Sequence, residues 1–467
     1  MEGKIGIMAE RAGKSKKSNQ IDMLHGSLWD KIVLFALPLA ASTILQQMFN
    51  SADVAVVGRF DSSQAMAAVG SNGAVINVLV NLFVGVSVGA NMLIANYIGQ
   101  GEREKVRQAV HTSVLIALIS GLFLAVAGLV LSRPVLRMLS TPPDVLELAV
   151  TYLEIYFMGM PFIMLYNFGS AVLRSKGDSR RPFWFLVVGG VVNVILNLVL
   201  VIAFRMGVTG VAIATVISNV ISAWMVLSCL MREPDPFAFS WREMSLKGGH
   251  TRRILKIGVP VGLQGVVFSL SNVFIQAGIN SFGASASAGS AAALNFEYFA
   301  YFIISAFAQA SMTFTSQNYG AGDEGRCRRI YTISMSWGIG LTALTCAAFS
   351  FWSEPLMRFY TVDAAVMTFA MARLFRAAVL EFLVGFYEIP GAALRGLGYS
   401  MTPTVITLMG SCVFRIFWLL TVFQWNRSFE MLMNVYAVSW VLMSVATIVA
   451  YYRLRPRAFS RRALGSF

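Results

Sequence analysis

Uninterrupted apolar runs long enough to cross a lipid bilayer restrict this chain more than any other feature. Residues 183–204 and 430–452 each exceed the ~18–20 residues that a transmembrane helix needs. Of all residues, 57% are hydrophobic and only 13% are charged, whereas a soluble domain carries roughly 25% charged residues. A chain of this composition cannot cover a surface that faces water. We therefore expect an all-α integral membrane protein whose outer surface contacts lipid.

Twelve transmembrane helices account for the alternation of apolar runs and polar connections. With the amino terminus in the cytoplasm, 28 Lys and Arg residues fall on the cytoplasmic side, 6 on the outer side and 3 within helices. Because positively charged loops stay in the cytoplasm, we expect a multi-pass protein of the cytoplasmic (inner) membrane with both termini inside. The net charge of +14 then reflects topology and needs no nucleic acid partner. The expected spans are residues 31–57, 65–98, 106–131, 145–173, 182–204, 208–231, 253–280, 286–317, 329–352, 365–394, 402–424 and 430–452.

An internal repeat divides the twelve helices into two sets of six. Six is an even number, so both halves begin on the same side of the membrane, which predicts a parallel repeat of two six-helix bundles. Three pairs of segments carry the repeat: Leu37-Pro38-Leu39 with Val259-Pro260-Val261, 222 positions apart, and, 221 positions apart, Gly99–Arg107 with Gly320–Arg328 and Ala171–Ser179 with Ala392–Ser400. We expect a cytoplasmic tail at 1–30, an N-lobe of helices 1–6 at 31–231, a cytoplasmic linker at 232–251, a C-lobe of helices 7–12 at 252–452, and a basic cytoplasmic tail at 453–467.

Motifs for nucleotide binding and for hydrolysis are missing from the sequence. Ala12-Gly13-Lys14-Ser15 lacks the first glycine of a phosphate-binding loop, and neither a GxSxG nor an HExxH motif occurs. The four cysteines form no CxxC pair, and we expect no metal cluster and no cofactor. The chain therefore reads as a transporter driven by an ion gradient, and not as an enzyme.

Three motifs resemble those of one transporter family. They are Pro38 followed by Met48–Arg59 in the first helix, the duplicated Ala-Leu/Val-Leu-Arg segment, and Asn193–Asn197 followed by Gly207–Thr215. In this order they resemble the multidrug and toxic compound extrusion (MATE) family, nearest its bacterial MepA-like branch. The resemblance implies a V-shaped pair of six-helix bundles. It also implies export of small cationic amphipathic molecules by alternating access, in exchange for H+ or Na+.

The resemblance also implies an ion-coupling site in the N-lobe. Asp53 matches the coupling carboxylate of the first helix, and Asn193 and Thr215 match two of its partners. Asn197 stands where a second carboxylate often stands, so we expect H+ rather than Na+, with Asp53 as the one candidate ligand for Na+. An ionisable group inside a membrane helix costs at least ~2.5–3.5 kcal/mol, which makes each such group a functional candidate. The alternatives are that Asp53 pairs with Arg59, that the asparagines only join helices, and that Thr215 bonds its own backbone.

Further polar groups inside the predicted helices are candidates for lining the substrate path. Two readings are open for the carboxylates: an acidic lining that attracts cations, or structural ion pairs with Arg373, Arg376 or Arg415. Phe268 occupies the place where other family members carry a glutamate. The substrate-binding candidates are Gln46, Gln47, Asn50, Gln264, Asn272, Gln276, Glu297, Glu381 and Glu388, and Glu154 shares the ambiguity of the carboxylates.

Our interpretation is therefore a secondary active multidrug exporter. We expect it to act as a monomer, with membrane lipids and small amphipathic substrates as its partners. The alternative is a flippase for lipid-linked precursors, which is built from similar paired bundles. A cavity for anionic pyrophosphate lipids needs several Arg or Lys residues, and only three arginines lie within the predicted helices.

Overall fold

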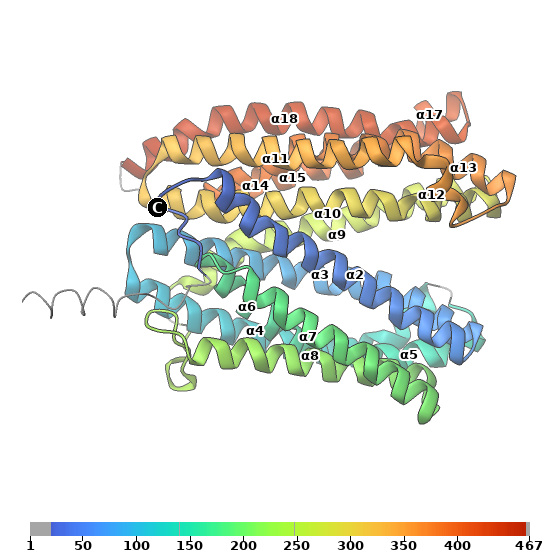
Figure 1. Cartoon of the computed structure of the whole chain (residues 1–467), viewed down its shortest axis with the longest axis horizontal. Helices are drawn as coiled ribbons and strands as arrows, with labels where there is room; N and C mark the ends of the chain where they lie inside the picture. The colour runs from blue at the N-terminus through green and yellow to red at the C-terminus, as the bar shows by residue number, and fades with distance from the viewer. Residues whose placement is uncertain (1–19, 140, 247, 464–467) are drawn as a thin grey trace, which may run out of the picture.

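The computed structural model describes residues 20–139, 141–246 and 248–463, and it is helical throughout. Two bundles lie side by side, coloured blue to green and yellow to red in Figure 1. The first bundle contains α2 (Trp29–Phe60), α3 (Ser63–Gln100), α4 (Arg103–Met138), α5 (Pro143–Met158), α6 (Met160–Ser175), α7 (Arg180–Leu198), a π-helical turn (Val199–Ala203) and α8 (Gly207–Met231).

The second bundle repeats this order after a linker that carries one short 3-10 helix (Trp241–Glu243). It contains α9 (His250–Asn280), α10 (Ala284–Ala321), α11 (Glu324–Phe351), α12 (Ser353–Arg358), α13 (Ala364–Arg376), a 3-10 helix (Ala378–Val384), α14 (Gly385–Gly396), α15 (Met401–Thr407), a π-helical segment (Leu408–Val413), α16 (Phe414–Leu420), α17 (Val422–Trp425) and α18 (Phe429–Ala463).

Most of the predicted spans are single long helices, and two are not. Among the described residues, ten helices are long and apolar enough to cross a membrane, and α5 with α6 forms an eleventh span bent by 49°. The span predicted at 365–394 is divided into α13, a 3-10 helix and α14. None of these three pieces is by itself long enough to cross a membrane, and the segment carries four charged residues, Arg373, Arg376, Glu381 and Glu388.

The outer faces of the bundles are apolar. Leu122, Phe123 and Val130 on α4, for example, are each more than 60% exposed. Contiguous exposed apolar surface of this kind marks an interaction surface in a soluble protein, but here it covers helices of membrane-spanning length. The molecule is therefore a multi-pass membrane protein whose outer faces contact lipid.

Small residues bring the two bundles into backbone contact. Gly85 and Gly89 of α3 face Gly258 and Gly262 of α9, and a Cβ atom added to Gly85 would lie 2.2 Å from the backbone nitrogen of Gly262. Two small residues four positions apart allow membrane helices to approach this closely. Side chains at these positions would force the two bundles apart.

Helix α2 belongs to both bundles. Ile32, Phe35 and Ala36 of its first half pack in one core cluster with residues of α10, including Phe314. Val57 of its second half packs in the core of the first bundle. A change in the position of α2 therefore alters the packing of both bundles.

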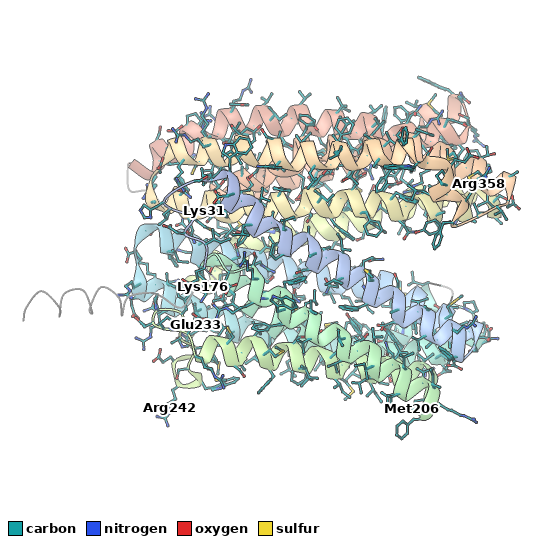
Figure 2. All side chains as sticks on the ribbon, viewed as in Figure 1. Lys31, Lys176, Met206, Glu233, Arg242 and Arg358 are labelled. Atoms are coloured by element: carbon teal, nitrogen blue, oxygen red, sulfur yellow. The ribbon has the colours of Figure 1, made fainter. Side chains whose placement is uncertain are left out.

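Hydrogen bonds between the bundles gather at the end that carries the linker. Within the described chain they join the last turns of α3 to α10 and α9, and Gln317 donates to the backbone oxygen of Ser175 over 2.5 Å. Figure 2 shows Lys176, Glu233 and Arg242 at this end and Met206 and Arg358 at the opposite end. The bundles converge at the linker end and diverge away from it (Figure 1).

Candidate functional site

A buried carboxylate in the second half of α2 is the centre of the candidate site. Asp53 is only 6% exposed. Asn197 of α7 donates from Nδ2 to Asp53 Oδ1 over 2.6 Å, and the Thr215 hydroxyl of α8 lies 3.4 Å from Asp53 Oδ2. The carboxylate thus joins three helices of the first bundle through neutral partners.

The partners of Asp53 also contact one another. Asn197 Nδ2 lies 3.2 Å from Asn193 Oδ1, and Asn193 Nδ2 lies 3.3 Å from the Thr215 hydroxyl. Residues four positions apart share one face of a helix, so Asn193 and Asn197 both point toward α2 and α8. The structure brings together all four residues that the sequence predicts for this site.

Local packing explains why α7 lies so close to α2. A Cβ atom on Gly190 would lie 1.8 Å from the ring of Phe49, so only glycine leaves room for this ring. Phe49 and Gly190 stand four and three residues before Asp53 and Asn193. The sequence analysis did not single out these two residues, although a glycine pair inside an apolar helix often marks a close approach.

In the described part of the chain, Asp53 does not form an ion pair with the guanidinium of Arg59, which was its alternative partner. Arg59 is exposed near the end of α2, and no ion pair between the two occurs among the described residues. Instead, the phenol groups of Tyr152 and Tyr156 on α5 lie close enough to interact electrostatically with Asp53. No motif in the sequence marks these two tyrosines.

In the second bundle, Glu297 forms a buried ion pair. Both of its oxygens accept hydrogen bonds from Arg373, from Nε over 2.6 Å and from Nη2 over 2.9 Å. Arg373 also donates to the hydroxyl of Ser290. Both charged side chains are less than 10% exposed. These contacts are those of the structural ion pair that the sequence analysis gave as one reading.

Two further charged groups lie in the core of the second bundle. Glu381 is 5% exposed, and Arg415 is 1% exposed. The guanidinium of Arg415 lies 4.6 Å from the ring centre of Tyr436 and 5.7 Å from that of Phe268. Phe268 thus packs against a cation at the place where the resemblance implies a glutamate.

The remaining substrate-binding candidates do not form one cluster. Arg395 joins two of them, since it donates to Gln264 over 2.6 Å and lies 3.4 Å from Glu388. Gln276 donates to Asn280 at the outer end of α9. Gln46 and Asn50 are exposed, whereas Gln47, Asn272 and Glu154 are half-buried.

The atoms around Asp53 suit a proton or a hard cation. The carboxylate, two amide groups and one hydroxyl supply oxygen atoms, which are the ligands that hard cations take. Asn197 Oδ1 is buried and accepts no hydrogen bond from the described residues. In the described part of the chain, no three His, Cys, Asp or Glu residues are placed so that they could hold a metal ion together. The donor set therefore fits Na+ by type, but with a single carboxylate.

Two repeated bundles of membrane helices, with a buried polar cluster in one of them, are an architecture common among transporters. The family model MatE matches residues 38–199 and again residues 260–420. The chain belongs to the MatE family, whose members are transporters. The two matches start 222 positions apart and end 221 apart, as the internal repeat predicts.

Relatives and solved structures agree with this assignment. The chain is 26% identical over 389 residues to the probable multidrug resistance protein YoeA of Bacillus subtilis, covering 82% of this chain and 84% of YoeA. It is 22% identical to the multidrug export protein MepA of Staphylococcus aureus, covering 91% and 93%. A MOP superfamily transporter from Pyrococcus furiosus has the same fold, with a TM-score of 0.86, 23% identity and coverage of 96% of this chain and 99% of that one.

Proposed function

We propose that this protein exports small cationic amphipathic molecules across the cytoplasmic membrane in exchange for protons. The observation that carries the proposal is that Asp53 is buried and has only amide and hydroxyl partners. A carboxylate held by a guanidinium, as Glu297 is by Arg373, is stabilised in its charged form. Within the described part of the chain Asp53 has no such partner, which leaves it free to exchange a proton or a cation.

Protonation of Asp53 changes the hydrogen bonds between three helices. The charged carboxylate accepts hydrogen bonds from Asn197 and Thr215. The protonated group carries an O–H that must donate, and the Thr215 hydroxyl can accept it while donating its own hydrogen to the backbone oxygen of Val211, 2.9 Å away. Because α2 packs on both bundles, this local change reaches the contact between them. Alternating access then follows from movement of one bundle against the other.

The relatives support the substrate class. YoeA and MepA carry the names of multidrug transport proteins. The negative charge of a carboxylate can be neutralised either by a proton or by the positive charge of a cationic drug. We place both termini in the cytoplasm because of the Lys and Arg distribution. We propose a monomer that works among membrane lipids.

The number of carboxylates favours protons over sodium. A site that holds Na+ without its water shell needs several oxygen ligands and gains from negative charge. Asp53 supplies the one carboxylate, and Asn197 supplies an amide where a second carboxylate would add charge. A single carboxylate with neutral partners is sufficient for proton exchange.

Purified protein in liposomes tests this proposal. A proton gradient and a sodium gradient are imposed separately, and uptake of a fluorescent cationic dye is followed. We expect dye movement with the proton gradient and its loss in Asp53→Asn, because an amide cannot take up or release a proton as a carboxylate can. Asp144→Asn, which removes an exposed carboxylate from the start of α5, serves as the matched control.

Two outcomes would contradict the proposal. Dye movement driven by the sodium gradient alone would show that the coupling ion is Na+ and not H+. No movement with either gradient, in protein shown to be folded, would favour the flippase alternative and lipid substrates.

A further inference from the structure

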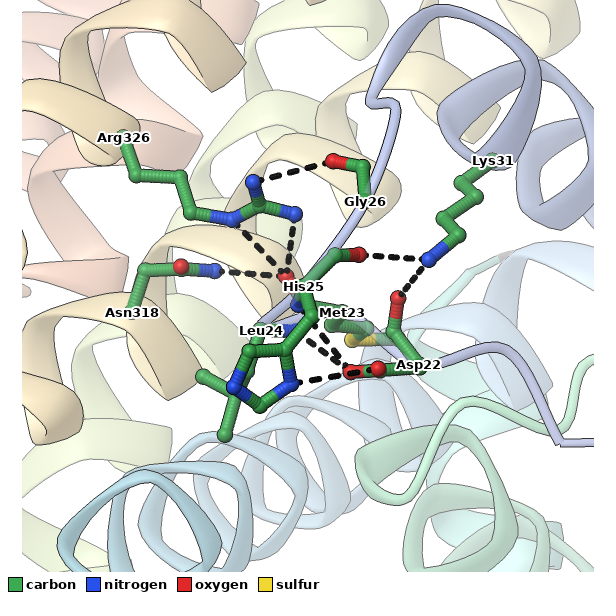
Figure 3. Close-up of polar contacts among 8 residues, drawn as sticks. All are labelled: Asp22, Met23, Leu24, His25, Gly26, Lys31, Asn318 and Arg326. Atoms are coloured by element: carbon green, nitrogen blue, oxygen red, sulfur yellow. Dashed lines mark hydrogen bonds and ion pairs between the residues drawn. The ribbon is translucent and has the colours of Figure 1, made fainter.

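Residues Gln20–Leu28, which precede α2, lie across the boundary between the two bundles (Figure 3). We call this segment the strap. On the first bundle, the backbone N–H of Ile21 donates to the backbone oxygen of Gly177, in the turn between α6 and α7, over 3.0 Å. The contact is close, because a Cβ atom on Gly177 would lie 2.2 Å from the Ile21 oxygen.

On the second bundle, the strap is held by more and stronger bonds. The backbone oxygen of Met23 accepts from Asn318 Nδ2 over 3.1 Å and from Arg326 Nη2 over 3.2 Å. Arg326 Nη1 donates to the oxygen of Gly26 over 3.0 Å. The Met23 side chain is 1% exposed and packs in the cluster that includes Phe314. Hydrogen bonds from a charged donor are stronger than neutral ones, so the strap belongs to the second bundle.

The strap is also fixed in shape by its own residues. Asp22 Oδ1 accepts from the backbone N–H groups of Leu24 and His25 over 3.0 and 3.1 Å. Lys31, in the first turn of α2, donates to the backbone oxygens of Asp22 and His25 over 2.8 and 2.5 Å. These hydrogen bonds connect the segment to α2 and hold it in a compact conformation. Extending the segment when the bundles separate would break them.

The two copies of the internal repeat differ at this point. Gly398 stands one repeat after Gly177, and both have a left-handed backbone with φ of +91° and +97°. The strap covers Gly177, whereas nothing lies within 4 Å of a Cβ position on Gly398. The contact with this turn is thus seen in one half of the duplicated fold among the described residues.

We propose that the strap fastens the two bundles together on the cytoplasmic side and sets how often that side opens. The inference rests on the proposed alternating access, since opening inward has to separate the turn at Gly177 from α10 and α11. Release occurs at Gly177, where one neutral backbone hydrogen bond is broken, while Asn318 and Arg326 keep the strap on the second bundle. The direct bond from Gln317 to Ser175 breaks in the same movement.

Thiol labelling tests the strap without any gradient or drug. Ser175 is buried between the bundles at the cytoplasmic end, and Ser175→Cys is introduced in a full chain whose four native cysteines are replaced by alanine. Its reaction with a membrane-impermeant maleimide reports cytoplasmic opening. We expect the rate to rise about threefold in Ile21→Pro, which removes the neutral donor at Gly177, and to rise less in Arg326→Gln, because the strap releases at Gly177 before the bonds of Arg326 break. Arg329→Gln, on an exposed arginine of the same helix α11, should leave the rate unchanged.

The outcomes separate the strap from the proposed transport. If neither variant labels faster than Arg329→Gln in protein of unchanged thermal stability, the strap does not fasten the bundles. A higher labelling rate in Arg326→Gln without one in Ile21→Pro also overturns the proposal. The hydrogen bond to Gly177 would then not hold the bundles together. If Arg326→Gln does not fold, Ile21→Pro alone decides. Faster labelling in a chain that moves no dye supports the strap and contradicts the drug export.

Discussion

The two bundles share one fold, yet their interiors differ in chemistry. In the first bundle, a single buried carboxylate is held by amides and a hydroxyl. The second bundle has apolar and aromatic groups at the corresponding positions, one repeat later, and its charges lie elsewhere. Ile275, Phe414, Trp418 and Tyr436 stand where the first bundle has Asp53, Asn193, Asn197 and Thr215.

This difference separates a charge that can be exchanged from charges that stabilise the fold. Glu297 and Arg373 neutralise each other in the core of the second bundle, and Arg415 packs against Tyr436, the counterpart of Thr215. The two copies therefore share their helices, whereas among the described residues the polar cluster around a buried carboxylate occurs in the first copy. The comparison predicts that mutations of buried charges will affect stability in one bundle and transport in the other.

The largest effect on stability is expected from breaking the ion pair of the second bundle. Arg373→Gln leaves the carboxylate of Glu297 buried without a cation, which typically costs about 3–5 kcal/mol. Asp53→Asn removes a charge that has no cationic partner, and we expect it to leave the unfolding temperature nearly unchanged. Thermal unfolding in detergent measures both.

The double variant Glu297→Gln with Arg373→Gln is the control for this comparison. It removes both charges and should recover much of the lost stability, because the cost comes from the unpaired group. Equal losses for Asp53→Asn and Arg373→Gln would show that the two bundles do not differ in the way we describe.

A second carboxylate in the first bundle should change the coupling ion. In Asn197→Asp, a second carboxylate lies next to that of Asp53, at a place where the amide of Asn197 now donates over 2.6 Å. Like charges this close cannot both ionise unless a cation lies between them. We expect sodium to stimulate dye transport by roughly tenfold in this variant, the equivalent of about 1.4 kcal/mol, and to have little effect on the wild type. The corresponding change in the second bundle, Trp418→Asp, should give no sodium response, and a response there would contradict the comparison.

The smallest effect concerns the linker, which forms buried ion pairs with the first bundle. Glu233 accepts from Lys176 and from Arg181. Burial raises the pKa of Glu233, but the hydrogen bonds and charges of Lys176 and Arg181 outweigh it and lower this pKa below the ordinary 4.5. A lowered pKa in the folded state stabilises the fold above pH 4.5, and the contribution disappears as the pH falls through the lowered value.

We therefore expect Glu233→Gln to lower the unfolding temperature at pH 7 by about 1 °C, because the entropy of unfolding grows with chain length and 1 kcal/mol gives a small shift in a chain of 467 residues. The difference from the wild type should shrink below pH 4.5. Glu104→Gln, at an exposed glutamate of α4, should show no such trend. A difference that persists at pH 3 would mean that Glu233 acts through packing and not through charge.

Much of this molecule could be predicted from the sequence, because the signals are local. Apolar runs of membrane-spanning length gave the helices, and α2, α8 and α9 begin and end within about four residues of their predicted limits. The repeat offset predicted two bundles, and the family model matches both. The spacing of Asn193 and Asn197 predicted that they share one helix face, and both contact the cluster around Asp53.

Only the tertiary structure decided which charges meet. Glu297 could have lined a path or paired with any of three arginines, and its bond to Arg373 depends on how α10 packs against α13. Likewise, nothing local marks residues 20–28 as a contact between the bundles. Sequence periodicity determines which face of a helix is polar, but the partner of that face is set by contacts between residues hundreds of positions apart, such as Met23 and Asn318.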